Sequence, residues 1–157
     1  MLAIALRAVD DGDLDDLFRM MNDPESIRMA AFTREDPADR GKFDAHQHRI
    51  RTDPEIIYRA ISCDGKLAGT IASFVMEGDT EITYWLDRPF WGHGIASEAL
   101  RLFLTVVPAR PLHARVASDN TSSRRVLAKA GFREVGTEIS YATGRGTEIE
   151  ETVLVLD

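Results

Sequence analysis

The amino-acid sequence predicts a single α/β domain with one mixed, mostly antiparallel sheet and helices on both of its faces. The chain has 157 residues, the usual size of one domain, and no linker or repeat divides 1–157. The tight-turn dipeptides Asp64-Gly65 and Gly78-Asp79 separate three strand-like runs and indicate an antiparallel meander. An amphipathic helix then joins the third run to another strand, a step that makes a parallel crossover.

The N-terminal part is predicted to be one strand followed by helices. Residues 2–9 alternate weakly between apolar and polar side chains, as a strand does. Asp13 is a suitable N-cap for a helix whose apolar residues recur with helical spacing as far as Met21. Residues 24–54 are rich in charges and prolines, so only short helical pieces are expected there, one of them at 39–51.

The later elements follow from hydrophobic period and turn residues. The expected strands cover 56–62, 67–76, 81–86, 112–117, 132–139 and 148–156. The expected helices cover 95–107 and 120–130. Gly131 is a typical residue to follow the C-terminus of the second of these helices.

Composition and charge exclude several classes of function. The formal net charge of −7 argues against non-specific nucleic-acid binding and is compatible with a cationic substrate such as an amine. An anionic cofactor would therefore need a local positive field. The single cysteine, Cys63, and the scattered histidines predict no disulfide framework and no metal site. No signal peptide and no apolar run of about 20 residues is present, so we expect a cytoplasmic protein without a membrane partner.

Residues 91–97, with the sequence WGHGIAS, form a glycine-rich link between a predicted strand and a predicted helix. Glycine lets the backbone turn tightly and approach a ligand closely. A helix start offers free N–H groups and partial positive charge, which suit a phosphate or pyrophosphate. The alternative is a plain glycine-rich turn with no ligand.

Two other phosphate-binding motifs compete for this segment. A Walker loop needs a lysine and a hydroxyl residue after its last glycine, and Ile95 follows Gly94 instead. The dinucleotide fingerprint is nearly met by Gly92, Gly94 and Ser97, with Asp119 near the end of the next strand. That fold opens with this unit, however, whereas hairpins come first here. A dinucleotide-binding oxidoreductase is therefore the weaker reading.

A second motif, residues 120–132 with the sequence NTSSRRVLAKAGF, completes the pattern. Together the segments resemble the GNAT superfamily of N-acetyltransferases, and within it the branch with the ribosomal-protein alanine N-acetyltransferases. The family's acetyl-CoA loop Gln/Arg-x-x-Gly-x-Gly/Ala is matched with Trp91 in the Gln/Arg place. The run 81–87, EITYWLD, resembles the family's E-I-x-Y-W-L strand. The resemblance is strong over 56–132 and implies a GNAT-like fold.

The resemblance implies how acetyl-CoA is held. In this family the strand before the loop splays from its neighbour and pairs with pantetheine, while amides of the loop receive the pyrophosphate. His93, Arg88 and Arg124 are candidates for local positive charge. The residues expected to bind the cofactor are Trp85, Leu86, Trp91, Gly92, His93, Gly94, Ile95, Ala96, Ser97, Asn120 and Ser123.

Catalysis requires a base for the amine and a donor for the departing thiolate. Glu81, at an acidic position often found on this strand, is the candidate base; the alternative is a plain strand-end carboxylate. Leu127 stands where many family members carry a tyrosine that serves the thiolate. Ser123 is therefore the candidate donor. Asn120 is expected to contact pantetheine, a role that competes with that of an ordinary N-cap.

These residues predict an acetyl-CoA-dependent N-acetyltransferase that acts on a primary amine by direct attack. A non-catalytic acyl-CoA-binding module remains the alternative, because of Leu127. The expected partners are acetyl-CoA and an amine acceptor, and not nucleic acid; a homodimer is left open. The acceptor itself stays open between a protein N-terminus and a small-molecule amine. Its determinants are expected in 24–52 and 140–147.

Overall fold

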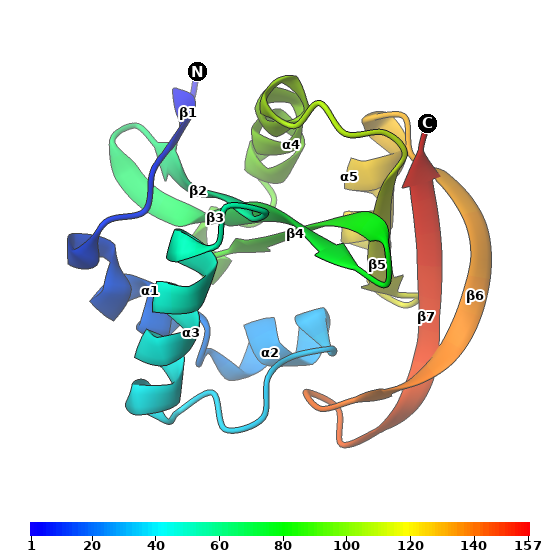
Figure 1. The fold of residues 1–157 in the computed structure, drawn as a ribbon, viewed down its shortest axis with the longest axis horizontal. Coiled ribbons are helices and arrows are strands. Elements are labelled where there is room, and N and C mark those ends of the chain that lie inside the picture. Colours follow the sequence, from blue (N-terminus) through cyan, green and yellow to red (C-terminus); the bar gives the residue numbers. More distant parts are fainter.

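The computed structural model describes residues 1–157 as one seven-stranded sheet with the strand order β1-β2-β3-β4-β5-β7-β6 (Figure 1). The strands are β1 (Ile4–Arg7), β2 (Ile57–Cys63), β3 (Lys66–Met76), β4 (Asp79–Leu86), β5 (Leu112–Ala117), β6 (Arg133–Ala142) and β7 (Thr147–Leu156). All neighbours are antiparallel except β4 and β5, which run parallel. The predicted mixed sheet with one parallel crossover is confirmed.

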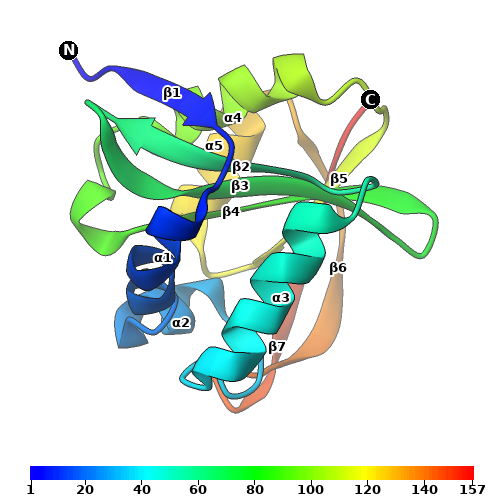
Figure 2. The ribbon, with the colours of Figure 1, turned by 60° about the vertical axis from the view of Figure 1, so that its left-hand side comes forward.

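Five α-helices cover the two faces of the sheet. They are α1 (Leu14–Met20), α2 (Pro24–Ala30), α3 (Arg40–Thr52), α4 (Ile95–Val106) and α5 (Thr121–Lys129). Figures 1 and 2 show α4 and α5 on one face and α1, α2 and α3 on the other. None of these helices has the length and apolar character that crossing a bilayer requires.

Each face of the sheet has its own hydrophobic core. Under α4, Leu100 and Phe103 pack with sheet residues such as Ile71. Under α1 and α3, Leu17 and Phe43 belong to a second cluster. Because side chains alternate between the faces of a strand, β4 contributes to both layers. The side chain of each β4 residue therefore lies on one face of the sheet or on the other.

The irregular segment 24–54 contains two helices with clear starts. Asp23 caps α2 by accepting a hydrogen bond from the Ser26 amide, and Pro24 occupies the first helical position. Asp39 caps α3 in the same way, from the Lys42 amide. The helix expected at 39–51 is confirmed within a residue, whereas the prediction did not give bounds for α2.

The parallel pairing between β4 and β5 is short, so a gap opens between these two strands. Only Thr80 pairs with Leu112, and Glu81 with His113. Beyond them the two strands diverge, so the backbone of β4 loses its neighbour on that side. The splayed strand implied by the family resemblance is therefore present, with Glu81 at the point of divergence.

Candidate active site

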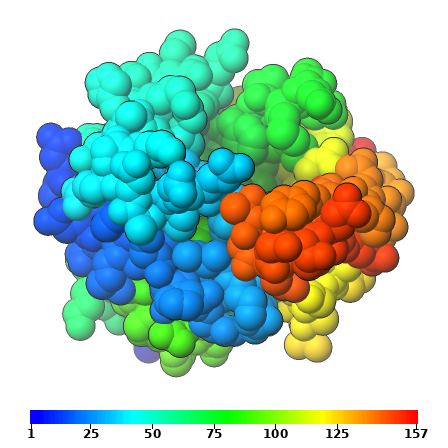
Figure 3. Space-filling view, turned by 90° about the horizontal axis from the view of Figure 1, so that it is seen from below, coloured from blue at the N-terminus to red at the C-terminus, as the bar shows by residue number.

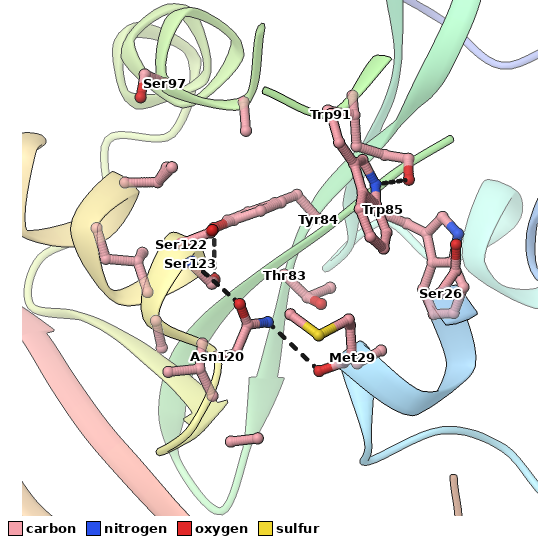
Figure 4. A pocket seen from close by; sticks show the side chains of 18 of the residues that line it. Ser26, Met29, Thr83, Tyr84, Trp85, Trp91, Ser97, Asn120, Ser122 and Ser123 are labelled. Atoms are coloured by element: carbon pink, nitrogen blue, oxygen red, sulfur yellow. Dashed lines mark hydrogen bonds between the residues drawn. The ribbon is translucent and has the colours of Figure 1, made fainter. Parts of the chain in front are cut away.

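A cavity of about 400 Å³ occupies the gap between the diverging strands. Its walls are residues 82–86 of β4, 114–117 of β5, and the starts of α4 and α5. Ser26 and Met29 of α2 close the remaining side (Figure 4). We call this space the cofactor cleft. A ligand lying in it meets the unpaired edge of β4 and the N-termini of α4 and α5.

The start of α4 gives the cleft an anion-binding end. Gly92 and Gly94 have φ angles of 78° and 74°, in the left-handed region that favours glycine. Gly94 is the N-cap, and no side chain caps the helix. The amides of the first turn are therefore free to bind a ligand, and the helix dipole adds partial positive charge. This geometry suits the pyrophosphate predicted for this loop.

The residues predicted to bind the cofactor lie in the cleft with one exception. Trp85, Leu86, Asn120 and Ser123 line it, as do all residues of 91–97 except His93. His93 has an exposed side chain that does not line the cleft. The prediction of a contact through the His93 side chain therefore has no support from its position.

The two arginines expected to add positive charge are occupied elsewhere. Arg88 forms an ion pair with Asp23, 2.9 Å away. Arg124 pairs with Glu134 at 2.7 Å and donates to the Ser118 carbonyl. Neither lines the cleft. The positive charge expected for a pyrophosphate at this end would consequently come from the backbone at the start of α4.

Two hydroxyl groups meet inside the cleft. The Tyr84 hydroxyl of β4 lies 2.6 Å from Ser123 Oγ on α5 (Figure 4). Burial raises the pKa of Tyr84, and the bond to Ser123 opposes that shift more weakly, so the phenol stays protonated at neutral pH. Leu127, in the usual tyrosine place, is 1% exposed and packs in the core. A tyrosine of β4, on the opposite wall of the cleft, thus places its phenol beside the Ser123 hydroxyl of α5.

Sequence reasoning did not find this pair. The sequence pointed to Ser123 as the candidate donor and assigned no catalytic role to the Tyr84 side chain. The available signal was the alternation along β4: Ile82, Tyr84 and Leu86 lie on the α4–α5 face and pack against that core. That pattern places Tyr84 on the correct face, but its distance from Ser123 depends on the packing of α5.

Asn120 joins two elements across the cleft. Its side-chain oxygen accepts from the Ser123 amide at 3.2 Å, which makes it the N-cap of α5. Its side-chain amide donates to the Met29 carbonyl of α2 at 3.4 Å. The N-cap role is thus present, and both polar ends of Asn120 are engaged. Contact with pantetheine stays a prediction and would use the second N–H of the amide or the other lone pair of its oxygen.

The two tryptophans support the cleft as well as lining it. Trp91 donates from its indole N–H to the Leu86 carbonyl at 2.8 Å, which ties the glycine loop to the end of β4. Trp85 donates to the Met20 carbonyl at 3.2 Å on the opposite face. The Leu86 carbonyl therefore already has a partner, so a pantetheine contact there would use its other lone pair or the amide.

Glu81, the candidate base, is 4% exposed and lines neither the cleft nor the neighbouring cavity described below. Arg115 Nε lies 3.4 Å from its carboxylate. Burial raises the pKa of Glu81, and the charges of Arg115 and His113 counteract the rise. Glu81 shares a sheet face with Thr83 and Trp85, which line the neighbouring cavity.

A second cavity, of about 470 Å³, lies on the α3 side of β4. It shares Phe32, Thr83, Tyr84 and Trp85 with the cofactor cleft. Its other walls come from 33–37, α3 and the ends of β2 and β3. Figure 3 shows the surface hollowed between α3 (cyan), the β3–β4 hairpin (green) and the β6–β7 hairpin (orange). We call this second space the acceptor cavity.

The segment 24–52 lines both spaces, through Ser26 to Phe32 in the cleft and Phe32 to Ile50 in the acceptor cavity. The segment 140–147 lines neither. It instead holds α2 in place: Gly144 donates its amide to the Ala31 carbonyl, and Arg145 bridges Asp119 and the Arg28 carbonyl. Tyr141 is 62% exposed and lies outside both cavities.

Comparison with known proteins identifies the family. The family model of the acetyltransferase (GNAT) domain matches residues 4–133. The probable N-acetyltransferase YjcK of Bacillus subtilis is 32% identical over 106 residues, covering 62% of this chain and 59% of YjcK. An uncharacterized N-acetyltransferase p20 of Bacillus licheniformis is 32% identical over 77 residues, covering 46% of this chain and 43% of p20. The chain thus matches less than two thirds of the length of either relative.

Solved structures share the whole fold. Mycobacterium smegmatis RimJ, in complex with CoA-disulfide, has a TM-score of 0.81 and 25% identity, covering 98% of this chain and 81% of that one. Spermidine N-acetyltransferase from Vibrio cholerae, in complex with CoA and spermine, has a TM-score of 0.79 and 17% identity, covering 97% and 95%. With the splayed strands, the glycine loop and a matching model over residues 4–133, this chain belongs to the GNAT acetyltransferase family.

Proposed function

We propose that this protein is an N-acetyltransferase that moves the acetyl group of acetyl-CoA onto a primary amine by direct attack. The main observation in support is that two cavities meet at one stretch of β4, residues 83–85. One cavity has an anion-binding helix start, and the other opens separately to the surface. Two substrates can therefore approach the same strand from different sides, as direct transfer requires.

We assign acetyl-CoA to the cofactor cleft because the two ends of the cleft match two parts of the cofactor. The amides at the start of α4 would hold the pyrophosphate, and the free edge of β4 would pair with pantetheine. The thioester would then lie near Tyr84 and Ser123. Solved relatives bind CoA, which supports this assignment.

The reaction balances without a further reagent. An alkylammonium has a pKa near about 10 and becomes a nucleophile only after it loses a proton. The amine nitrogen then attacks the thioester carbonyl, a C–N bond forms, and the C–S bond breaks. A backbone N–H of residues 84–86 is the proposed donor to the oxyanion that forms in between. The nitrogen loses its second proton as the thiolate leaves.

Glu81 is the proposed acceptor of the ammonium proton, directly or through water. Its raised pKa makes it a stronger base than a surface carboxylate. The charges of Arg115 and His113 counteract part of that rise in the pKa. The same carboxylate could be purely structural, as the partner of Arg115, and the pH experiment described in the Discussion separates the two roles.

Tyr84 and Ser123 are proposed to serve the leaving thiolate. A thiol like that of cysteine has a pKa of about 8.5, so near pH 7 the expelled thiolate is stabilised by a hydrogen bond or a proton. Ser123 would donate to sulfur while accepting from the Tyr84 hydroxyl. In this proposal the pair supplies the donor whose absence at Leu127 favoured a non-catalytic binding module.

A thiol-release assay with acetyl-CoA and a panel of primary amines tests the function. We expect amine-dependent release of free CoA and an N-acetylated product by mass spectrometry. Calorimetry with acetyl-CoA and with NAD(H) is run alongside. Acetyl-CoA binding without turnover on any amine would favour the binding module, and NAD(H) binding would favour the oxidoreductase.

A further inference from the structure

The acceptor cavity contains two arginines that have no acidic partner. Arg34 donates to the Lys42 carbonyl, and Arg49 to the imidazole of His46. The neighbouring cations differ: Arg40 pairs with Asp44, and Lys42 with Asp36. The chain as a whole has a net charge of −7. Arg34 and Arg49 are exposed where they line the cavity, and neither contacts a carboxylate.

His46 lies with these arginines on the cavity wall. Its Nδ1 is 2.7 Å from the Arg49 guanidinium, which can only donate, so Nδ1 accepts and the ring proton sits on Nε2. Burial, with the charges of Arg34 and Arg49, lowers the pKa of His46 to about 4. The imidazole is therefore neutral. The group offers three sets of donors and contains no anion.

Two carboxylates line the same cavity just beyond the C-terminal end of α3. These are Asp53, whose side chain accepts from the Glu55 amide, and Glu55 itself. Arg49 is four residues before Asp53, a spacing at which ion pairs form readily on a helix. Its guanidinium nevertheless contacts His46 and makes no ion pair with Asp53. Arg49 therefore keeps N–H donors for an anionic ligand, in a cavity whose wall carries both signs of charge.

The rest of the wall is apolar and aromatic. It includes Phe32, Phe43, Ile50, Phe74 and Trp85. Trp85 and Thr83 mark the end where the cavity meets the cofactor cleft. A ligand with an amine at that end, an apolar middle and an anionic group near α3 would match the cavity along its length.

We propose that the acceptor is a primary amine that carries an anionic group, a carboxylate or a phosphate-type group, bound by Arg34, Arg49 and His46. This inference rests on the proposed N-acetyltransferase function and specifies its substrate class. Arginine binds such groups through two parallel N–H bonds, and these are stronger than neutral hydrogen bonds. A polyamine has no group that uses these donors, so it is disfavoured.

Pairs of amines with closely similar basicity test the proposal by kinetics. We compare 4-(aminomethyl)benzoate with benzylamine, and 6-aminohexanoate with hexylamine, and include 3-aminopropylphosphonate and spermidine. The anionic member of each pair should have a kcat/KM roughly 10- to 100-fold higher, the range expected for a charged hydrogen bond. Arg34→Met and Arg49→Met should remove most of that preference, because they lower kcat/KM for the anionic amine of each pair far more than for the neutral one.

Arg133→Met is the control, because Arg133 lies on the exposed end of β6 and pairs with Asp157. It makes the same change in net charge and should leave the preference intact. Equal kcat/KM values within each pair, or a preference that survives in both cavity variants, would overturn the proposal. Faster acetylation of spermidine than of any anionic amine would do the same.

A binding measurement keeps the test independent of turnover. Calorimetry on the CoA-saturated protein compares 4-(acetamidomethyl)benzoate with N-benzylacetamide, which are the products of the first pair. Tighter binding of the anionic product, lost in Arg49→Met, supports the proposal even if no tested amine is turned over. No difference between the two products refutes it. Failure of the enzyme function alone would appear as absent turnover with this anion preference retained.

Discussion

The Tyr84–Ser123 pair leads to the sharpest prediction about catalysis. If Tyr84 acts through Ser123, removing the Tyr84 hydroxyl weakens the hydrogen bond that Ser123 donates to sulfur, but Ser123 remains as a donor. The O···O distance of 2.6 Å is at the short end for hydroxyl hydrogen bonds. A neutral hydrogen bond contributes about 0.5–1.5 kcal/mol, so Tyr84→Phe should lower kcat by about 2- to 12-fold.

Ser123→Ala removes the group proposed to contact sulfur and should cost more. A bond to the developing thiolate is charge-assisted, and its loss corresponds to a fall in kcat of roughly 10- to 100-fold. The KM for acetyl-CoA should change little in either variant, because the interaction strengthens only as negative charge develops on sulfur. Steady-state thiol release at saturating amine measures both quantities.

The double variant decides between a coupled pair and two independent groups. In a coupled pair, adding Tyr84→Phe to Ser123→Ala has no further effect, since Tyr84 has lost the atom through which it acts. Tyr141→Phe, an exposed position outside both cavities, is the control for the chemical change. Two single effects that multiply in the double variant would refute the coupling, and an unchanged kcat for Ser123→Ala would refute the serine role.

Four other predictions concern the cofactor, the base, the arginine beside the base, and the α5 cap. Gly94→Glu puts bulk and negative charge at the start of α4 and should lower acetyl-CoA affinity by orders of magnitude in calorimetry; Gly78→Glu, with a similar positive φ of 85° at an exposed turn, should not. The activity of the wild type should fall as the pH drops through the pKa of Glu81, which burial raises. Glu81→Gln should lose most of its rate near neutral pH and less at high pH, where free amine is plentiful. An equal loss of rate at every pH would indicate a structural role instead. Arg115→Met removes a charge that lowers this pKa, so the acid limb of the pH–rate profile should move to higher pH. Asn120→Ala should destabilise the fold by about 1 kcal/mol, seen as a fall in Tm of about 2–4 °C, and an unchanged Tm would contradict its capping role.

Much of this architecture was already determined by local sequence. The dipeptides Asp64-Gly65 and Gly78-Asp79 specify turns whatever surrounds them, and the meander follows from them. Gly94 before an amphipathic run likewise specifies an uncapped helix start. Turn chemistry and hydrophobic period act over a few residues, so they can be read without the fold. The prediction was weakest over 24–54, where no single period dominates.

The tertiary structure alone decided which side chains meet. Tyr84 and Ser123 are 39 positions apart, and their contact depends on the angle at which α5 packs over the diverging β4 and β5. The packing of whole elements also decides that Arg124 pairs with Glu134 and does not line the cleft. It likewise decides that Arg34 and Arg49 line the acceptor cavity. Sequence therefore determined the elements and the uncapped helix start to which the pyrophosphate is assigned in our proposal. Long-range packing determined the hydroxyl pair and the charge of the acceptor cavity, because distances between remote side chains are set by the register and packing of whole elements.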